Sequence, residues 1–235
     1  MTRLIAGIDV GSTTVKAVVA DAETNAILWK DYRRHETRQL ETLLDFLERM
    51  ERETGLGPGN GRVFTTGAGA SMFTELIGAK FVQEVLAASL AVERRCPEAA
   101  SFVEIGGQDA KIVILRKETK DGPAKKFPSM NDKCAGGTGS VIDKISMKLG
   151  IPLANLSGLH YDGIRLHPVA GKCGVFAETD INGLQKQGIP AEELMASLFE
   201  AFVIQNLQVL ARGHTLLPHV LLLGGPNAFI PGMRE

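Results

Sequence analysis

Two stretches of this chain share one pattern: an apolar run, a glycine-rich turn that carries an acidic residue, and a second apolar run. The first copy is GIDVGSTTVKAV, with predicted strands over residues 3–10 and 14–20. The second is VEIGGQDAKIV, with predicted strands over residues 101–105 and 111–115. A repeat of this kind predicts two related α/β halves, each opening with such a hairpin. We expect the domains to span residues 1–98 and 99–235.

The first hairpin turn, DVGST, has the composition of a phosphate-binding loop. It presents the backbone N–H groups of Gly11, Ser12 and Thr13 toward one point. The carboxylate of Asp9 at the strand end is suited to hold Mg²⁺ through water. An ordinary Gly-Ser hairpin explains this stretch equally well, so the turn alone leaves both interpretations open.

Two of the three cysteines stand directly before helical patterns. Cys134, in NDKCAGGTGS, precedes an amphipathic run that starts near Val141, and Cys173, in GKCGVFAETD, precedes another over residues 175–184. The helix dipole stabilises a thiolate at a helix N-terminus, which suits it to bind a metal or a cluster. Cys96 we interpret as a small structural residue. Because the chain has only three cysteines, and no CxxC pair among them, it cannot supply a four-cysteine metal site alone.

The rest of the chain alternates strand and helix patterns. Further strands are predicted over residues 26–33, 63–65 and 219–223, and helices over residues 41–52, 81–92, 141–149, 175–184 and 194–210. The polar segment 116–126 contains a Gly-Pro break and predicts a solvated hairpin tip. Gly224 and Gly225, which follow the last strand, allow close approach of a flat ligand such as a nucleobase or ribose.

Charge and cysteine content narrow the possible partners. The 26 Lys and Arg residues nearly balance 27 Asp and Glu residues, giving a formal charge of -1. A net charge this close to zero gives no sign of the excess of basic residues that binds nucleic acid or an anionic membrane. No segment approaches the roughly 18 apolar residues of a membrane span. Three widely spaced cysteines fit a reducing compartment. We therefore expect a cytoplasmic protein that binds neither nucleic acid nor membrane.

Taken in order, five motifs resemble one family: GIDVGSTTVKAV, VEIGGQDAKIV, MNDKCAGGTG, GKCGVFAETD and LLGGPNAF. It is the BadF/BadG/BcrA/BcrD-type ATPase family, which includes activators of 2-hydroxyacyl-CoA dehydratases and ATP-binding subunits of benzoyl-CoA reductase. The resemblance implies two actin-like (ribonuclease H-like) domains with a nucleotide cleft between them, as in actin, Hsp70 and the sugar kinases. Because the chain ends soon after LLGGPNAF, we expect the second domain to lack its C-terminal part.

The resemblance also implies an activity. It is that of an ATP-dependent activator, which hydrolyses ATP to drive low-potential electron transfer from an intersubunit [4Fe-4S] cluster to an iron–sulfur CoA-thioester dehydratase or reductase. The cofactors would be ATP, Mg²⁺ and the cluster. A homodimer would hold the cluster, and ferredoxin or flavodoxin would serve as electron donor.

Residue by residue, the resemblance implies three groups of site residues. The cluster ligands would be Cys134 and Cys173 from each subunit, which agrees with the two candidate thiolates per chain. Residues that position Mg²⁺, water or the γ-phosphate would be Asp9, Gln108 and Asp109. Residues that contact the nucleotide would be Gly11, Ser12, Thr13, Gly106, Gly107, Gly224 and Gly225.

Two departures from the family pattern stand out. Glu104 replaces the usual Asp before IGGQD, and the segment after GGPNAF is more similar to that of long, multidomain activases. Three alternatives stay open. A small-molecule kinase of the same superfamily would use Asp109 as its catalytic carboxylate. A nucleotide-gated interaction module would have no chemistry of its own, and zinc would fit paired thiolates from two chains.

Overall fold

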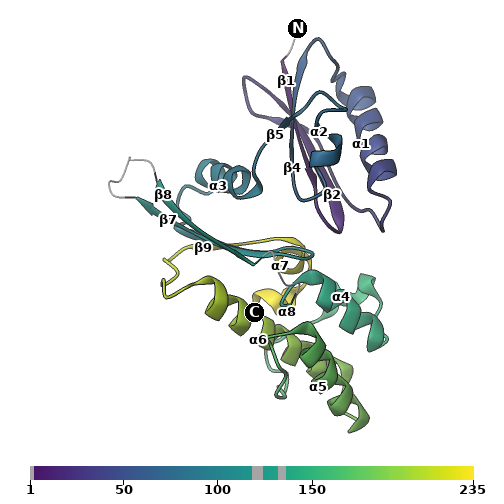
Figure 1. Ribbon diagram of the computed structural model, residues 1–235, viewed down its shortest axis with the longest axis vertical. Helices are drawn as coiled ribbons and strands as arrows, with labels where there is room; N and C mark the ends of the chain where they lie inside the picture. Colours follow the sequence, from purple (N-terminus) through teal and green to yellow (C-terminus); the bar gives the residue numbers. More distant parts are fainter. Residues whose placement is uncertain (1–2, 118–123, 132–135) are drawn as a thin grey trace. The chain divides into compact units, whose positions relative to one another are not determined.

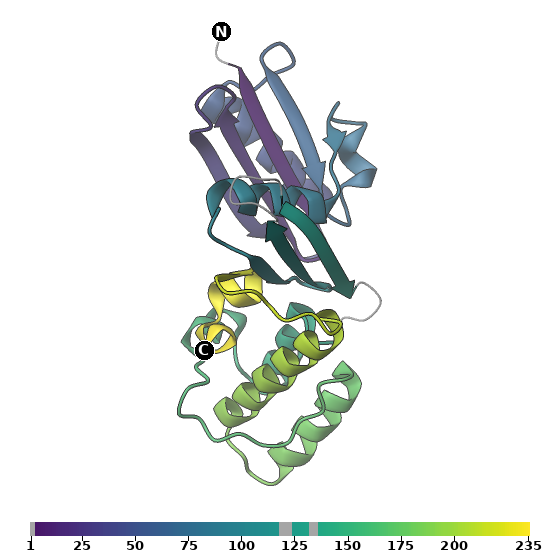
Figure 2. The same ribbon diagram turned by 90° about the vertical axis from the view of Figure 1, so that its left-hand side faces the viewer.

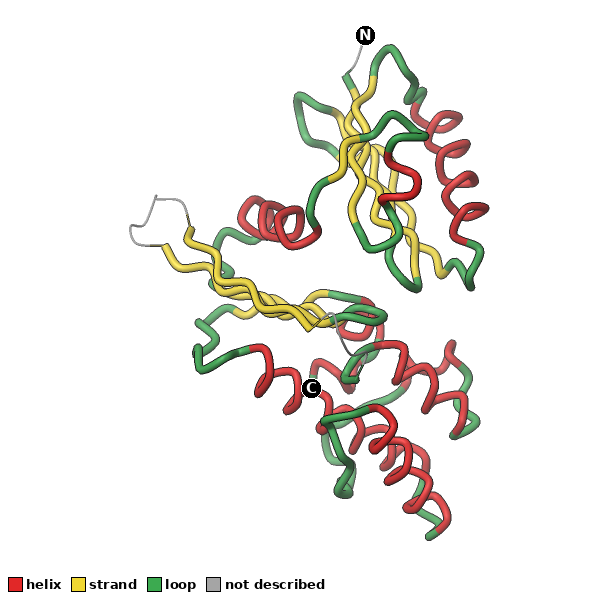
Figure 3. Tube along the Cα trace, in the orientation of Figure 1, coloured by secondary structure: helices red, strands yellow, loops and turns green. Residues whose placement is uncertain are grey.

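The computed structural model describes residues 3–117, 124–131 and 136–235. The chain forms two compact units, Met1–Ala91 and Val92–Glu235. Each unit combines one mixed sheet with helices (Figures 1 and 3). No helix in the described part of the chain is long and apolar enough to cross a membrane.

The first unit is built on a five-stranded sheet with the order β3-β2-β1-β4-β5. Strand β2 is antiparallel to both β1 and β3, whereas β4 runs parallel to β1 and to β5. The strands are β1 (Leu4–Val10), β2 (Thr14–Asp21), β3 (Ile27–Arg34), β4 (Gly61–Thr66) and β5 (Lys80–Phe81), and the helices are α1 (Gln39–Thr54), α2 (Ser71–Thr74) and α3 (Glu84–Arg95), which continues past Ala91.

Alternating residues give the two faces of this sheet different roles. The even-numbered residues of β1, from Leu4 to Val10, are buried, and they pack with Leu43 and Phe46 of α1 in one apolar core. Figure 1 shows α1 lying along this face. The period of two places Gly7 and Asp9 on the opposite face, where they are half-buried. One face of the sheet therefore supplies stability, and the other is available to carry a site.

The second unit is built on a four-stranded sheet, counted over the described residues, with the order β8-β7-β6-β9. Strand β7 pairs antiparallel with β6 and β8, and β9 runs parallel to β6. The strands are β6 (Ser101–Ile105), β7 (Ala110–Lys117), β8 (Ala124–Asn131) and β9 (Val220–Leu223), and the helices are α4 (Gly139–Lys148), the 3₁₀ helix η1 (Leu153–Gly158), α5 (Gly174–Lys186), α6 (Ala191–Leu210), α7 (Gly225–Phe229) and α8 (Pro231–Arg234).

Helix α6 is the centre of this unit's core. It buries Leu198, Phe199 and Phe202 in one apolar cluster with β6, β7 and the facing sides of α4 and α5. Figure 2 shows α6 running past α5. Each large side chain buried this way contributes about 1.5–3 kcal/mol. The core holds α4 and α5 in a defined arrangement behind the sheet.

Three strands of one unit match three strands of the other. In each, a hairpin (β1–β2 or β6–β7) is followed by a strand that pairs parallel with its first arm (β4 or β9). The prediction of two α/β halves is therefore confirmed. The predicted hairpin tip over residues 116–126 was too long at both ends, because β7 continues to Lys117 and β8 already begins at Ala124.

Candidate functional site

A backbone hydrogen bond closes the turn of the first hairpin. The N–H of Gly11 donates to the carbonyl of Thr14 at 2.9 Å, so the turn contains Ser12 and Thr13. At the base of the turn, Lys16 Nζ donates to Asp9 Oδ2 at 2.6 Å. The other carboxylate oxygen, Asp9 Oδ1, is buried and has no hydrogen-bond partner among the described residues.

The second hairpin has the same closure. The N–H of Gly106 donates to the carbonyl of Asp109 at 2.8 Å, and the turn contains Gly107 and the exposed Gln108. Lys111 is almost fully buried, with 1% of its side chain exposed, and its Nζ lies 2.9 Å from Asp109 Oδ2 and 3.4 Å from Glu104 Oε2. Burial of an ammonium group is costly unless it is paired, so Lys111 holds both carboxylates close.

Strand register shows that the two hairpins correspond residue by residue. Asp9 is the cross-strand partner of Lys16, and Glu104 is the cross-strand partner of Lys111. Glu104 therefore keeps the acid–lysine pair of the first hairpin with one more methylene. The sequence interpretation missed both lysines. Their equal separation from the preceding acid in the two repeats was the signal that could have identified them.

Two glycines hold β4 and β9 against the hairpins of their units. Gly67 follows β4 with φ +95°, and a Cβ there would lie 2.5 Å from the Val10 carbonyl oxygen. Gly224 follows β9 with φ +92°, and a Cβ there would lie 2.0 Å from the Ile105 carbonyl oxygen. Any side chain would be strained by the backbone angle and would collide with the neighbouring backbone. Gly224, which precedes the first residue of α7, Gly225, thus lies directly beside the second hairpin.

The second turn is also bonded to the N-terminus of α4. The N–H groups of Gly139 and Ser140 donate to the carbonyls of Gly106 and Gly107 at 2.9 and 2.7 Å, and Thr138 Oγ1 donates to Gly107 at 3.0 Å. Orphan N–H groups at a helix start are thereby satisfied by the turn itself. A displacement of this turn would be transmitted directly to α4.

Cys173 is the N-cap residue of α5, so the prediction that it opens a helix is confirmed. A Cβ on Gly174 would lie 3.0 Å from Val141 Cγ2, which shows that α5 and α4 begin side by side. Val175 and Phe176, in the first turn of α5, are 64% and 63% exposed. Cys134 lies outside the described residues. In the part of the chain that is described, no three His, Cys, Asp or Glu side chains gather as metal ligands.

Further along the same helices, α4 and α5 are joined by an ion-pair cluster. Glu178 accepts hydrogen bonds from Lys144 at 2.6 Å and Lys148 at 2.8 Å. These bonds, that from Lys144 foremost, lower the pKa of Glu178 from 4.5 to about 2. A carboxylate with a lowered pKa stabilises the fold above its unfolded-state pKa, and this stabilisation is lost as the pH falls from about 4.5 toward about 2.

Glu178→Gln should therefore lower the melting temperature modestly at pH 6, and the difference from the wild-type protein should shrink below about pH 4.5 and largely disappear near pH 2. The effect stays small because Lys144 is more than half exposed and solvent screens the pair. Thermal unfolding measured across this pH range checks the prediction. Glu98→Gln, at an exposed position of the same unit, is the matched control. A difference that persists unchanged at pH 2 would contradict the assignment.

The predicted site residues fall into two groups. Asp9, Gly11, Ser12 and Thr13 lie together on the first hairpin, in the first unit. The second unit brings together the second-hairpin residues and the glycines after β9, which are Gly106, Gly107, Gln108, Asp109, Gly224 and Gly225. Each group offers glycine turns that a phosphate can approach, and carboxylates suited to a hydrated divalent cation.

Known proteins with a similar fold or sequence were compared with this chain. A solved structure of the activator of the 2-hydroxyisocaproyl-CoA dehydratase from Clostridium difficile, with bound ADPNP, aligns with a TM-score of 0.81 at 24% identity, over 99% of this chain and 83% of that chain. The (R)-2-hydroxyglutaryl-CoA dehydratase activating ATPase of Acidaminococcus fermentans is 25% identical over 231 residues, 93% of this chain and 81% of that protein. The uncharacterized protein MJ0004 of Methanocaldococcus jannaschii is 30% identical over 202 residues, 85% of this chain and 77% of that protein.

The fold is thus that of the actin-like ATPases, with one actin-like lobe in each unit. The profile of the BadF/BadG/BcrA/BcrD ATPase family matches residues 6–227, nearly the whole chain. The chain belongs to the BadF/BadG/BcrA/BcrD ATPase family, as its five motifs predicted.

Proposed function

We propose that this protein is an ATP-dependent activator. It hydrolyses ATP to drive low-potential electron transfer from a [4Fe-4S] cluster, shared by two subunits, to an iron–sulfur CoA-thioester dehydratase or reductase. Family membership and the activating ATPase among the relatives support the ATP-dependent role. The observation that carries the electron-transfer part is Cys173, which caps α5 beside the start of α4 and next to exposed apolar residues.

The two hairpins are the proposed nucleotide contacts. The backbone N–H groups of Ser12, Thr13 and Gly107 would donate to phosphate oxygens, and Gly224 and Gly225 would face the adenosine. Asp9 fits a role at Mg²⁺, because its buried Oδ1 is an acceptor with no partner among the described residues. Bound Mg²⁺ would neutralise charge on the transferring phosphoryl group. Gln108 and Asp109 would orient the attacking water, Asp109 being held in place by Lys111.

Cys173, together with Cys134, fits the thiolate ligands of an iron–sulfur cluster, which supplies the electron when bound. Two thiolates from one chain leave half of the ligand set to a second copy. Val175 and Phe176, large apolar residues with most of their surface exposed beside Cys173, are suited to pack against that copy. A homodimer centred on the start of α5 is therefore part of the proposal, with ferredoxin or flavodoxin as electron donor.

Direct hydrogen bonds support coupling between the two sites. The second turn is bonded to the first turn of α4, and α4 packs on α5 through Val141 and Glu178. A change of the turn on ATP hydrolysis would therefore move the helix start that Cys173 caps. This is how hydrolysis would alter the exposure of the cluster to its partner.

Strictly anaerobic purification tests the proposal. We expect iron and sulfide in equal amounts, about two of each per chain. The molar mass should be that of two chains, and ATP hydrolysis should need no added phosphate acceptor. A colourless, iron-free protein that hydrolyses ATP only when a hydroxyl compound is added would instead identify a kinase of the same fold. An iron-free protein whose assembly changes with ATP would identify a nucleotide-gated interaction module. Zinc in stoichiometric amount under these conditions would contradict the cluster.

A further inference from the structure

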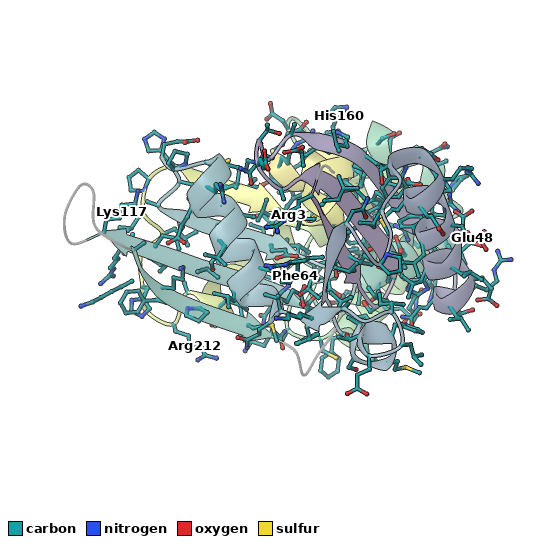
Figure 4. All side chains as sticks on the ribbon, turned by 90° about the horizontal axis from the view of Figure 1, so that it is seen from above. Arg3, Glu48, Phe64, Lys117, His160 and Arg212 are labelled. Carbon is teal, nitrogen blue, oxygen red and sulfur yellow. The ribbon has the colours of Figure 1, made fainter. Side chains whose placement is uncertain are left out.

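A cavity of about 710 Å³ lies beside the first half of β4, in the first unit. Strand β5 pairs with β4 only at Phe64, labelled in Figure 4, and Thr65, so residues 61–63 have no neighbouring strand on that side in the described part of the chain. The C-terminal end of α1, the loop after it and the turn before β5 enclose this space. Its volume is that of a small-molecule site, which typically measures about 300–1,000 Å³.

One side of the cavity is an apolar wall. Leu56 is 8% exposed and belongs to the core of the unit, and Leu47 and Ile77 pack against that core. The three side chains come from the loop after α1, from α1 itself and from the turn before β5, and all line the cavity. Core packing fixes their positions, so the wall exists before any ligand binds, as is usual for small-molecule sites.

Asn60 fixes the loop that forms one rim of the cavity. Its Oδ1 accepts the N–H of Gly57 at 2.8 Å, and its Nδ2 donates to the carbonyl of Gly55 at 2.9 Å. Its own carbonyl accepts the N–H of Leu4 at 2.9 Å, which ties the loop to β1. Glycine-rich segments lose much conformational freedom on folding. Three hydrogen bonds from one residue therefore indicate a rim that is held in one conformation.

Two cations and one carboxylate also line the cavity. They are Arg62 of β4, Lys80 of β5 and Glu51 of α1. Lys80 is the register partner of Phe64, two residues after Arg62, so both cationic side chains project from the same face of the sheet. All three charged residues are exposed, and none of them forms an ion pair among the described residues. Two positive charges against one negative leave the lining with a net charge of +1.

We propose that this cavity binds a small organic monocarboxylate with an apolar body. The apolar body would lie against Leu47, Leu56 and Ile77, where burial of hydrocarbon is favourable. The carboxylate would accept charge-assisted hydrogen bonds from Arg62 and Lys80. A single negative charge matches the net charge of the lining, whereas a phosphate monoester would bring nearly two.

This site is separate from the proposed nucleotide and cluster sites. The residues that line the cavity lie within positions 47–80 and include none of the turn residues of either hairpin and neither cysteine of the proposed cluster. The inference therefore does not rest on the proposed function. Carboxylate binding can be measured whether or not the protein hydrolyses ATP or contains iron.

Octanoate tests the site, with octyl phosphate and octanol as probes of charge, each titrated into the wild-type protein at pH 7 by calorimetry. Octanoate should bind more tightly than the other two. Arg62→Gln and Lys80→Gln should each weaken octanoate binding about tenfold, as expected for one lost hydrogen bond between charged groups. Glu51→Gln should strengthen it about two- to threefold, because it removes a like charge. Lys30→Gln, an exposed position on β3 at the other edge of the sheet, is the matched control and should change nothing.

Leu47→Ala separates the apolar wall from the charges, because it should weaken octanoate and octanol alike. Octanoate should also slow acetylation of Lys80 by acetic anhydride, followed by mass spectrometry, and leave that of Lys30 unchanged. Absence of octanoate binding, or equal binding of octanol, would overturn the proposal, and tighter binding of octyl phosphate would overturn the choice of a carboxylate. Acetylation of Lys80 at the same rate with and without octanoate would show that the ligand binds elsewhere.

Discussion

Cys173→Ala, purified without oxygen, should contain almost no iron and lose the broad visible absorbance of an iron–sulfur cluster. Cys173 is the N-cap residue of α5, and no other cysteine among the described residues lies on α4 or α5. In a cluster shared by two chains, the variant would remove two of the four ligands at once. The wild-type protein should carry about two irons per chain, and the variant close to none.

Cys96→Ala is the matched control, because Cys96 is the other described cysteine and belongs to the same unit. It should keep the iron content of the wild-type protein. Cys134→Ala should lose iron as Cys173→Ala does, and both should bind ADP almost as tightly as the wild-type protein. A Cys173→Ala protein with full iron content would show that the ligand assignment is wrong, whatever its ATPase activity.

The parts of the fold that could be predicted are those in which a local pattern coincides with burial. Strand β1 alternates buried and half-buried residues, and its predicted range differs from the observed one by a single residue. Strand β8 was missed because it lies at the sheet edge and contains Lys125, Lys126 and Pro128, residues that edge strands tolerate and that hide the apolar period. The short elements α2 and β5 carry too few residues to show a period at all.

The residues of the candidate site also fall into two classes, those with a local sequence signal and those that only the fold brings together. The turn residues could be identified because glycine next to an acidic residue is a local signal. Gly67 could not, because it is far from Asp9 in the sequence and only the parallel register of β1 and β4 brings it beside the first hairpin. Lys111 was hidden for a related reason. A lysine inside an apolar strand is unusual, but its meaning depends on the two carboxylates that surround it.

Asp9→Asn should lower the rate of ATP hydrolysis roughly 100-fold or more, with ADP binding in EDTA nearly unchanged. The carboxylate carries two duties in the proposed site: Oδ2 holds Lys16, and the buried Oδ1 faces the cation. An amide has no charge to offer either group, and its NH₂ cannot accept a hydrogen bond from metal-bound water.

Steady-state phosphate release at saturating Mg²⁺ and ATP measures this effect. Glu48→Gln is the control for loss of one carboxylate from the same unit, since Glu48 is exposed on α1, the helix on the opposite face of the sheet (Figure 4). It should hydrolyse ATP at the wild-type rate. If Asp9→Asn also did so while folding normally, Asp9 would not hold the cation.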